Sequence, residues 1–378
     1  MPEHADTRFH QAIVMLEIGT DDSIAASMAR ASRVMAPPWG PMLDLARRLH
    51  EARARGSALP PADVALPAAR ALAIAAGSST PYYASLGLLG VDAHFAAWKL
   101  EALRRIRAAG VYRGDTEVSS ALGEGMLRLS RGDWAGGLRA IRRIEGATAH
   151  SYGDRMSSAR LACLGAWLGV VDAATADSTL RRVRALPGGD AAPMDRAELR
   201  WLDGLLGIVT GDAARVQGAR RALLSDTAVI ARMPARSLHG LWLERTNREA
   251  GADTLRAVSE TAIRDGGFLL SVEAVDRLVL ARALRRRGSP ADVERYLMWP
   301  DAATNFVPNF TVKFALEPLV SYERGLALEE AGDHRAAAFR LQRFIDAFDE
   351  PPPSQRDLVT DARDRLGRLR KTDAPGAR

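Results

Sequence analysis

The stretch Gly325-Leu-Ala-Leu-Glu-Glu-Ala-Gly332-Asp333 decides the fold of this chain. It places one glycine seven residues before a Gly-Asp pair, inside a run of apolar residues with a helical period. The same spacing recurs for Gly125 with Gly132-Asp133 and for Gly204 with Gly211-Asp212. The first glycine lets two helices approach closely, and the second lets the chain leave the first helix. The pattern therefore predicts a repeated helix–turn–helix unit.

Apolar stripes on both sides of each turn support this interpretation. Before the turn at Gly211, Trp201, Leu205 and Ile208 fall at positions i, i+4 and i+7 of one helical face. We expect the stripes of all three units to form the core. Their residues are Leu122, Met126, Leu129, Leu138, Ile141, Ile144, Trp201, Leu205, Ile208, Val216, Ala219, Leu223, Leu319, Tyr322, Leu326, Ala337, Leu341, Phe344, Ile345 and Phe348.

The series of turns extends beyond these three units. Further turns are expected at Gly90, Asp172, Gly251 and Gly288, so that successive turns lie 37 to 44 residues apart. The positions seven residues before these four turns, where close packing is expected, are Tyr83, Gly165, Glu244 and Ala281. Together with the Gly-Asp turns, this series predicts about seven antiparallel helix pairs.

Several residues are suited to helix ends. Asp195 and Glu198 have the spacing of a capping box, which would satisfy the first free N–H groups of a helix. Pro351-Pro-Pro353 stops one helix, and Ser354 is a good N-cap for the next. That last helix has an apolar stripe and a polar outer face, as a terminal cap needs. The stripe consists of Leu358, Ala362, Leu366 and Leu369.

These residues lead to a family resemblance. Tetratricopeptide repeat (TPR) arrays carry a small residue seven positions before a turn glycine and an alanine five positions after it, and the chain resembles them. Ala337 fills the second position and Gly137 is a small substitute, while Val216 and Val293 depart from the pattern. The steps are also longer than the usual 34 residues of the family. The resemblance covers about residues 80–350. The segment 322–369 is similar to the end of TPR arrays attached to bacterial serine/threonine kinases and related regulators.

The resemblance implies an all-α fold, a right-handed α-solenoid of about seven antiparallel helix pairs with a C-terminal capping helix. We expect an irregular helical segment over residues 1–60, the repeat array over 61–350, and the capping helix with a short disordered tail over 351–378. Helices are plausible over 41–55 and 62–76. Pro300 and Pro308 indicate a loop insertion over 298–317, which would explain the longest step.

Composition narrows the class of protein. Of 52 basic residues only Lys99, Lys313 and Lys371 are lysines, a bias that is typical of a GC-rich bacterial genome. The net charge of +6 is therefore a weak argument for nucleic acid, which is not expected as a partner. Cys163 is the single cysteine, so a disulfide within the chain is excluded. No signal peptide and no membrane span are recognised, and a cytoplasmic location is expected.

No motif for catalysis is found. The seven histidines are scattered without metal-ligand spacing, and no nucleophile elbow, phosphate loop or dinucleotide fingerprint occurs. The kinase motifs of the proteins that the chain resembles are missing too. We therefore expect no catalytic residue, no cofactor and no metal. In a signalling system of that kind, the chain would be the sensor or docking part.

Arginine pairs recur near the ends of the expected helices. One interpretation is solvated charge at helix C-termini, which the helix dipole favours. The other is a basic edge that binds an acidic peptide or a phosphate. The residues of this candidate edge are Arg142, Arg143, Arg181, Arg182, Arg220 and Arg221, and Arg104-Arg105 is a further pair.

The sequence favours a protein–protein interaction scaffold that holds an unidentified protein or peptide in the groove lined by the first helix of each pair. The alternative is an enzyme whose helix pairs close into an α/α toroid around a central acidic site. DNA binding is a third option, but the chain lacks a recognisable recognition helix. The sequence does not predict an oligomeric state.

Overall fold

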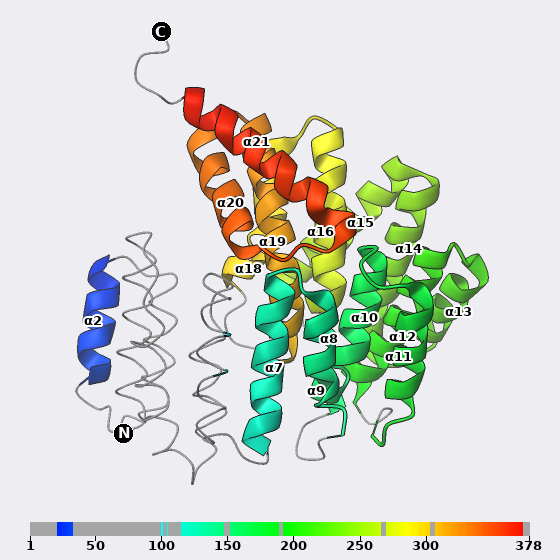
Figure 1. The fold of residues 1–378 in the computed structure, drawn as a ribbon. Helices are drawn as coiled ribbons and strands as arrows, with labels where there is room; N and C mark the ends of the chain where they lie inside the picture. The colour runs from blue at the N-terminus through cyan, green and yellow to red at the C-terminus, as the bar shows by residue number, and fades with distance from the viewer. Residues whose placement is uncertain are drawn as a thin grey trace. The chain divides into compact units, whose positions relative to one another are not determined.

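The computed structural model describes residues 21–32, 100, 104, 115–146, 152–188, 192–265, 270–302 and 307–372 (Figure 1). Every regular element in these residues is a helix, so the all-α prediction is confirmed for them. The chain divides into two compact units, residues 1–128 and 129–378. None of the described helices is long and apolar enough to cross a membrane.

The first unit is described only in part. It contains α2 (Asp21–Ser32) and most of α7 (Asp115–Ser130). Leu122 and Met126 of α7 are buried, as their stripe predicts. The helices expected over 41–55 and 62–76, and the turn expected at Gly90 with Tyr83 before it, lie outside the described residues.

The described part of the second unit consists of α-helices and three short 3₁₀ helices, and neighbouring helices pack in adjacent pairs. The α-helices are α8 (Trp134–Arg142), α9 (Tyr152–Arg155), α10 (Ser157–Trp167), α11 (Ala173–Arg184), α12 (Pro193–Thr210), α13 (Ala213–Leu224), α14 (Arg232–Thr246), α15 (Arg248–Asp265), α16 (Leu270–Arg286), α17 (Val293–Leu297), α18 (Trp299–Ala302), α19 (Val307–Glu330), α20 (His334–Ala347) and α21 (Arg356–Thr372). The 3₁₀ helices are η1 (Val229–Ala231), η2 (Pro290–Asp292) and η3 (Pro353–Gln355).

Each of the three Gly-Asp pairs named above forms the turn that its spacing predicts. Gly132, Gly211 and Gly332 have left-handed φ angles of 92°, 74° and 85°. The aspartate that follows each glycine is the N-cap of the next helix, because its side chain accepts a hydrogen bond from a backbone N–H three residues later. Asp172 caps α11 in the same way. One residue pair thus ends one helix and starts the next.

The prediction of a turn at Gly251 is wrong. Gly251 lies inside α15, and the chain turns at Asn247, the C-cap residue of α14. A methyl group on Gly251 would overlap the backbone nitrogen and Cα of Glu244, so this glycine serves the close approach of α14 and α15. The glycine seven residues before the true turn is Gly240, which packs against Leu255.

The proposed loop insertion over 298–317 is also wrong, because α18 and the first half of α19 occupy it. Pro308 is the second residue of α19, where a proline costs little since the N–H groups of the first turn have no helical partner.

The capping box predicted for Asp195 and Glu198 is not formed. The helix that contains Glu198 has Ala192 at its N-cap, and the Glu198 side chain pairs with Arg160 instead.

The stripes expected to form the core are buried, with Ile345 partly exposed. A helix, α21, is present where the capping helix is expected: Ala362, Leu366 and Leu369 are buried, Leu358 is partly exposed, and α21 contacts α20. Ser354 does not cap it. It lies within η3, and its hydroxyl donates to the carbonyl oxygen of Gly169 at 3.3 Å.

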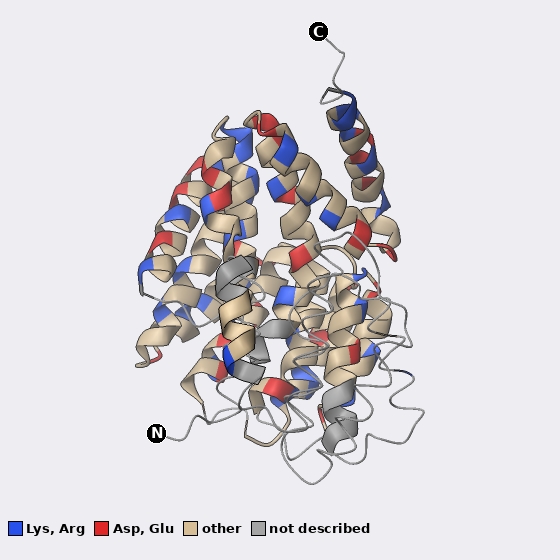
Figure 2. Cartoon of the chain, turned by 90° about the vertical axis from the view of Figure 1, so that its left-hand side faces the viewer, with Lys and Arg blue, Asp and Glu red and all other residues tan. Residues whose placement is uncertain are grey.

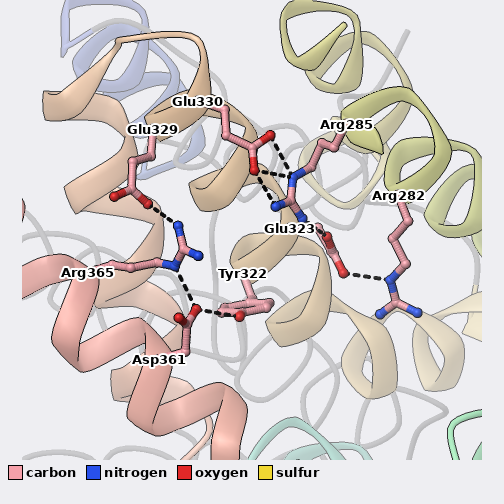
Figure 3. Close-up of polar contacts among 8 residues, drawn as sticks. All are labelled: Arg282, Arg285, Tyr322, Glu323, Glu329, Glu330, Asp361 and Arg365. Carbon is pink, nitrogen blue, oxygen red and sulfur yellow. Dashed lines mark hydrogen bonds and ion pairs between the residues drawn. The ribbon is translucent and has the colours of Figure 1, made fainter. Parts of the chain in front are cut away.

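Ion pairs tie α21 and α16 to α19 (Figure 3). Arg365 of α21 reaches Glu329 at 2.6 Å and Asp361 at 2.7 Å, and Asp361 also accepts a hydrogen bond of 2.6 Å from the Tyr322 hydroxyl. Glu323 of α19 is shared by Arg282 and Arg285 of α16, at 2.6 Å and 2.8 Å. The polar edges of these three helices are therefore held together by shared charges.

The first helices of successive pairs form a circuit of contacts, which we call the inner circuit. It runs through α10, α12, α14, α16 and α19, and each of these helices contacts the next. The helix α19 also contacts α10, so the circuit is closed. The second helices α11, α13, α15 and α20 each pack against the preceding member. In an open array each unit touches only its neighbours, so the contact of α19 with α10 is an additional one.

The close approach at Gly251 yields a test. Gly251→Ala should destabilise the protein by about 1–3 kcal/mol, because the new methyl group meets backbone that cannot rotate away. The matched control is Gly218→Ala in α13, where no atom lies within 4 Å of the new methyl group. That change should be neutral or stabilising by up to about 1 kcal/mol. Urea unfolding followed by circular dichroism measures both, and equal effects of the two changes would contradict this packing.

Candidate functional site

The six arginines of the candidate edge lie at or near the C-terminal ends of α8, α11 and α13. Arg142 ends α8, Arg143 is its C-cap, and Arg181 and Arg182 stand in the last turn of α11. Arg221 stands in the last turn of α13 with Arg220 beside it. All six are exposed except Arg220, which is half-buried. Of the further pair, Arg104 is exposed and Arg105 lies outside the described residues.

Arg181 and Arg182 form ion pairs with described residues. Arg181 pairs with Asp177 at 2.9 Å, and Arg182 reaches Glu145 at 2.8 Å. Figure 2 shows the same mixing over the described helices, where basic and acidic residues alternate. For Arg220 and Arg221 no ion pair with a described residue is found. Arg142 has none either, but it lies near the charge of Glu145, so the two arginines of α13 are the part of the edge most available to a partner.

Two exposed apolar side chains follow these arginines, one at the end of α13 and one at the start of η1. Leu224 is 55% exposed and Val229 is 74% exposed. The acidic residue between them, Asp226, is directed inward to Arg196 at 3.0 Å and Arg200 at 2.6 Å. Its hydrogen bond with Arg196 is the main cause that lowers its pKa to about 2. We call Arg220, Arg221, Leu224 and Val229 the α13 edge.

A second candidate site, which the sequence did not reveal, lies within the inner circuit. Many polar side chains of these five helices are buried. We define the polar centre by five of them, which hydrogen bonds connect between α10, α12, α14 and α16: Arg160, Glu198, Ser237, Ser271 and Asp276.

One part of the polar centre is an ion pair. The Arg160 guanidinium donates to both oxygens of Glu198, at 2.7 Å and 2.8 Å, and the Ser271 hydroxyl donates to the same carboxylate. Burial raises the pKa of Glu198, but the charge and hydrogen bonds of Arg160 outweigh it and the net shift is downward. Because Ser271 belongs to α16 and Glu198 to α12, this contact spans two helices that α14 separates in the circuit.

The other part of the polar centre is a short chain of hydrogen bonds. Trp201 Nε1 donates to Ser237 Oγ at 3.0 Å, and the Ser237 hydroxyl donates to Asp276 at 2.6 Å. The second oxygen of Asp276 is buried without a hydrogen-bond partner. Burial, with the neighbouring charge of Glu273 as a smaller cause, raises the pKa of Asp276 to about 8. This carboxyl group therefore carries its proton at neutral pH.

Such a carboxyl group has the properties of a general acid or base, since its pKa lies near neutrality. Its position argues for a structural role, because Asp276 is fully buried and no substrate reaches it in this conformation. Cys163 is also buried, and burial raises the pKa of its thiol, which disfavours a nucleophilic role. Among the described residues, no group of three histidine, cysteine or acidic side chains could hold a metal ion.

The sequence does carry a signal for the polar centre. Glu198 precedes Trp201 and Leu205 by three and seven residues, so it occupies the same helical face as the apolar stripe. A charged residue at such a position predicts a buried partner. The identity of that partner does not follow, because Arg160 belongs to another helix 38 residues away.

Comparisons with protein-family models, with curated proteins and with solved structures give no match for this chain.

The raised pKa of Asp276 predicts how stability depends on pH. Above about pH 4 the unfolded carboxyl group has lost its proton, whereas the buried group keeps its proton until about pH 8. The native state then binds more protons, so the contribution of Asp276 to stability decreases by about 1.4 kcal/mol per pH unit across this window. Asp276→Asn should remove this slope and keep the hydrogen bond with Ser237.

Urea unfolding at a series of pH values measures the effect as the difference between the wild type and the variant. Asp364→Asn, which alters an exposed carboxyl group of α21, is the control and should leave the slope unchanged. A slope that is the same in the wild type and in Asp276→Asn would show that this group does not titrate in the core.

Proposed function

We propose that this chain is a non-catalytic scaffold of the TPR-like class, a right-handed α-solenoid that binds a protein or peptide partner. The support is the repeated helix pair: left-handed glycines end the first helices, aspartates cap the second helices, and Ala337 is buried five residues after its turn. The circuit of α10 to α19 fits a solenoid that is wound tightly enough for its ends to touch. A role as sensor or docking part of a bacterial signalling system rests on the resemblance alone.

The α13 edge carries this proposal. It combines two arginines that have no ion pair with a described residue and two exposed apolar side chains, within ten residues of sequence. Protein interfaces are enriched in arginine and depleted in lysine, and the centre of an interface is more apolar than its rim. The partner that fits is a protein segment with acidic residues beside a large apolar side chain. The inner faces of the first helices are buried in this conformation, so the exposed edge and not the groove is open to a partner.

Binding at the α13 edge can be tested by loss of charge. Arg220→Ser with Arg221→Ser should weaken capture of partners from a cell extract and reduce the dependence of that capture on salt, because two charges that attract an acidic segment are lost. The matched control removes two exposed arginines of α21, Arg356→Ser with Arg363→Ser, which should leave capture unchanged. Equal capture by all three proteins, measured by quantitative mass spectrometry at two salt concentrations, would exclude the edge.

The apolar half of the edge has its own control. Leu224→Ser with Val229→Ser should also weaken capture, whereas Phe339→Ser on α20 removes a side chain that is exposed to a similar degree and should not. Loss of binding in both would indicate general adhesion to apolar surface.

A second candidate is an enzyme of the α/α-toroid type. The closed inner circuit and the buried acidic groups Glu198 and Asp276 favour it. In that reading Asp276, which is protonated at neutral pH, would act as the acid once a substrate reaches it. An open superhelix has a larger radius of gyration than a closed ring of equal mass, so solution scattering distinguishes an open scaffold from a toroid. It does not distinguish a scaffold with a closed circuit from a toroid. A ligand that protects α16 from hydrogen exchange in the wild type, and fails to do so in Asp276→Asn, would favour the enzyme.

A further inference from the structure

The inner circuit closes at one place that no covalent connection supports. The chain connects every other neighbouring pair in it through the helix or helices between them, such as α11 between α10 and α12, whereas α10 and α19 come from opposite ends of the circuit. A second set of contacts joins the α7–α8 turn to the segment after α20, where Arg131 reaches Asp349 at 2.7 Å and Glu350 at 2.8 Å. The backbone N–H of Glu350 also donates to the carbonyl oxygen of Arg131 at 2.8 Å. We call the junction of residues 131–132 with residues 348–351 the seam.

The polar contacts of the seam are weak ones. The side chains of Asp349 and Glu350 are 43% and 46% exposed, and exposed ion pairs add little to stability and are screened by salt. The hydrogen bond from Ser354 to Gly169, at 3.3 Å, is exposed as well. The contacts of α19 with α9 and α10 must supply the rest.

The groups enclosed by the circuit oppose closure. One oxygen of Asp276, one oxygen of Glu273 and the Nε of Arg277 are buried without a hydrogen-bond partner. A buried polar group without a partner costs free energy that it recovers in water. Opening the seam would separate α10 from α19 without breaking the chain, and would admit water to these groups.

We infer that the seam is a gate: the array exchanges between the closed circuit and an open form in which α19 leaves α10 and the polar inner faces of the first helices become accessible. This inference goes beyond the α13 edge, which is exposed in both forms. It supplies the condition under which the groove of a helical-repeat array becomes a binding surface.

Two glycines with matching backbone provide the test. Gly132 and Gly332 both have left-handed φ angles, 92° and 85°, so alanine is strained at either position. At Gly132 the new methyl group would also lie 2.8 Å from the Glu350 carbonyl oxygen and 3.0 Å from the Phe348 ring. At Gly332 nothing lies within 4 Å. The difference between the two variants therefore reports the seam alone.

Amide hydrogen exchange of the full chain measures opening. Gly132→Ala should raise exchange in α10 and α19 by about tenfold or more over Gly332→Ala, with the other helices changed equally in the two variants. Cys163, the single thiol of the chain, lies in α10, but charged groups of α11, α12 and α13 (Asp177, Asp203, Arg215) lie around it, so its labelling reports separation of α10 from those helices and not from α19. Its labelling rate should match between the two variants.

A milder variant covers the case in which Gly132→Ala does not fold. Asp349→Asn with Glu350→Gln removes the ion pairs and keeps the shape, and should raise exchange in α10 and α19 in the same way. Asp253→Asn, which breaks the exposed pair of Asp253 with Arg287 at 2.7 Å, is its control. The gate is refuted if exchange in α10 and α19 does not change selectively, or if Cys163 labelling accelerates along with it.

Discussion

Three helix pairs, α7 with α8, α12 with α13 and α19 with α20, depend on one local device, the Gly-Asp turn. A left-handed glycine ends the first helix of a pair, and the carboxylate that follows satisfies an N–H group of the second helix. Because both tasks fall to adjacent residues, the turn is short and the two helices return side by side. Close packing then follows from a small residue one or two turns earlier, as where Gly325 lies against Leu341. These three helix pairs are consequences of this constraint, and two of them supply α12 and α19 to the inner circuit.

The sequence predicts those parts of the fold that local chemistry determines. The turns at Gly132, Gly211 and Gly332 and the stripes around them are of this kind, and each agrees with the structure. The turn placed at Gly251 failed because glycine has two uses, and here it serves close helix contact while Asn247 makes the turn. The loop insertion predicted over residues 298–317 failed for a similar reason, because proline also has two uses. Pro308 is tolerated at the start of a helix.

The polar centre could not be predicted, because it depends on contacts between helices far apart in sequence. Glu198 has the spacing of a capping residue, and only the packing of α10 against α12 gives it Arg160 as a partner instead. A buried ion pair contributes little to net stability but is costly to break from one side, so it favours one arrangement of helices over others. The partly unsatisfied groups near Asp276 disfavour the closed arrangement. The free energy of closure is therefore a small difference between opposing contributions.

Closure of the circuit is the central claim, and a zero-length cross-link tests it most directly. Arg131→Lys keeps the charge at the seam and supplies an amine in a chain that otherwise has three lysines. A carbodiimide should then join residue 131 to Asp349 or Glu350 within one molecule, as efficiently as it joins residue 287 to Asp253 in Arg287→Lys. A product from the 287 variant without one from the 131 variant would show that the seam is not formed, and would contradict the closed circuit.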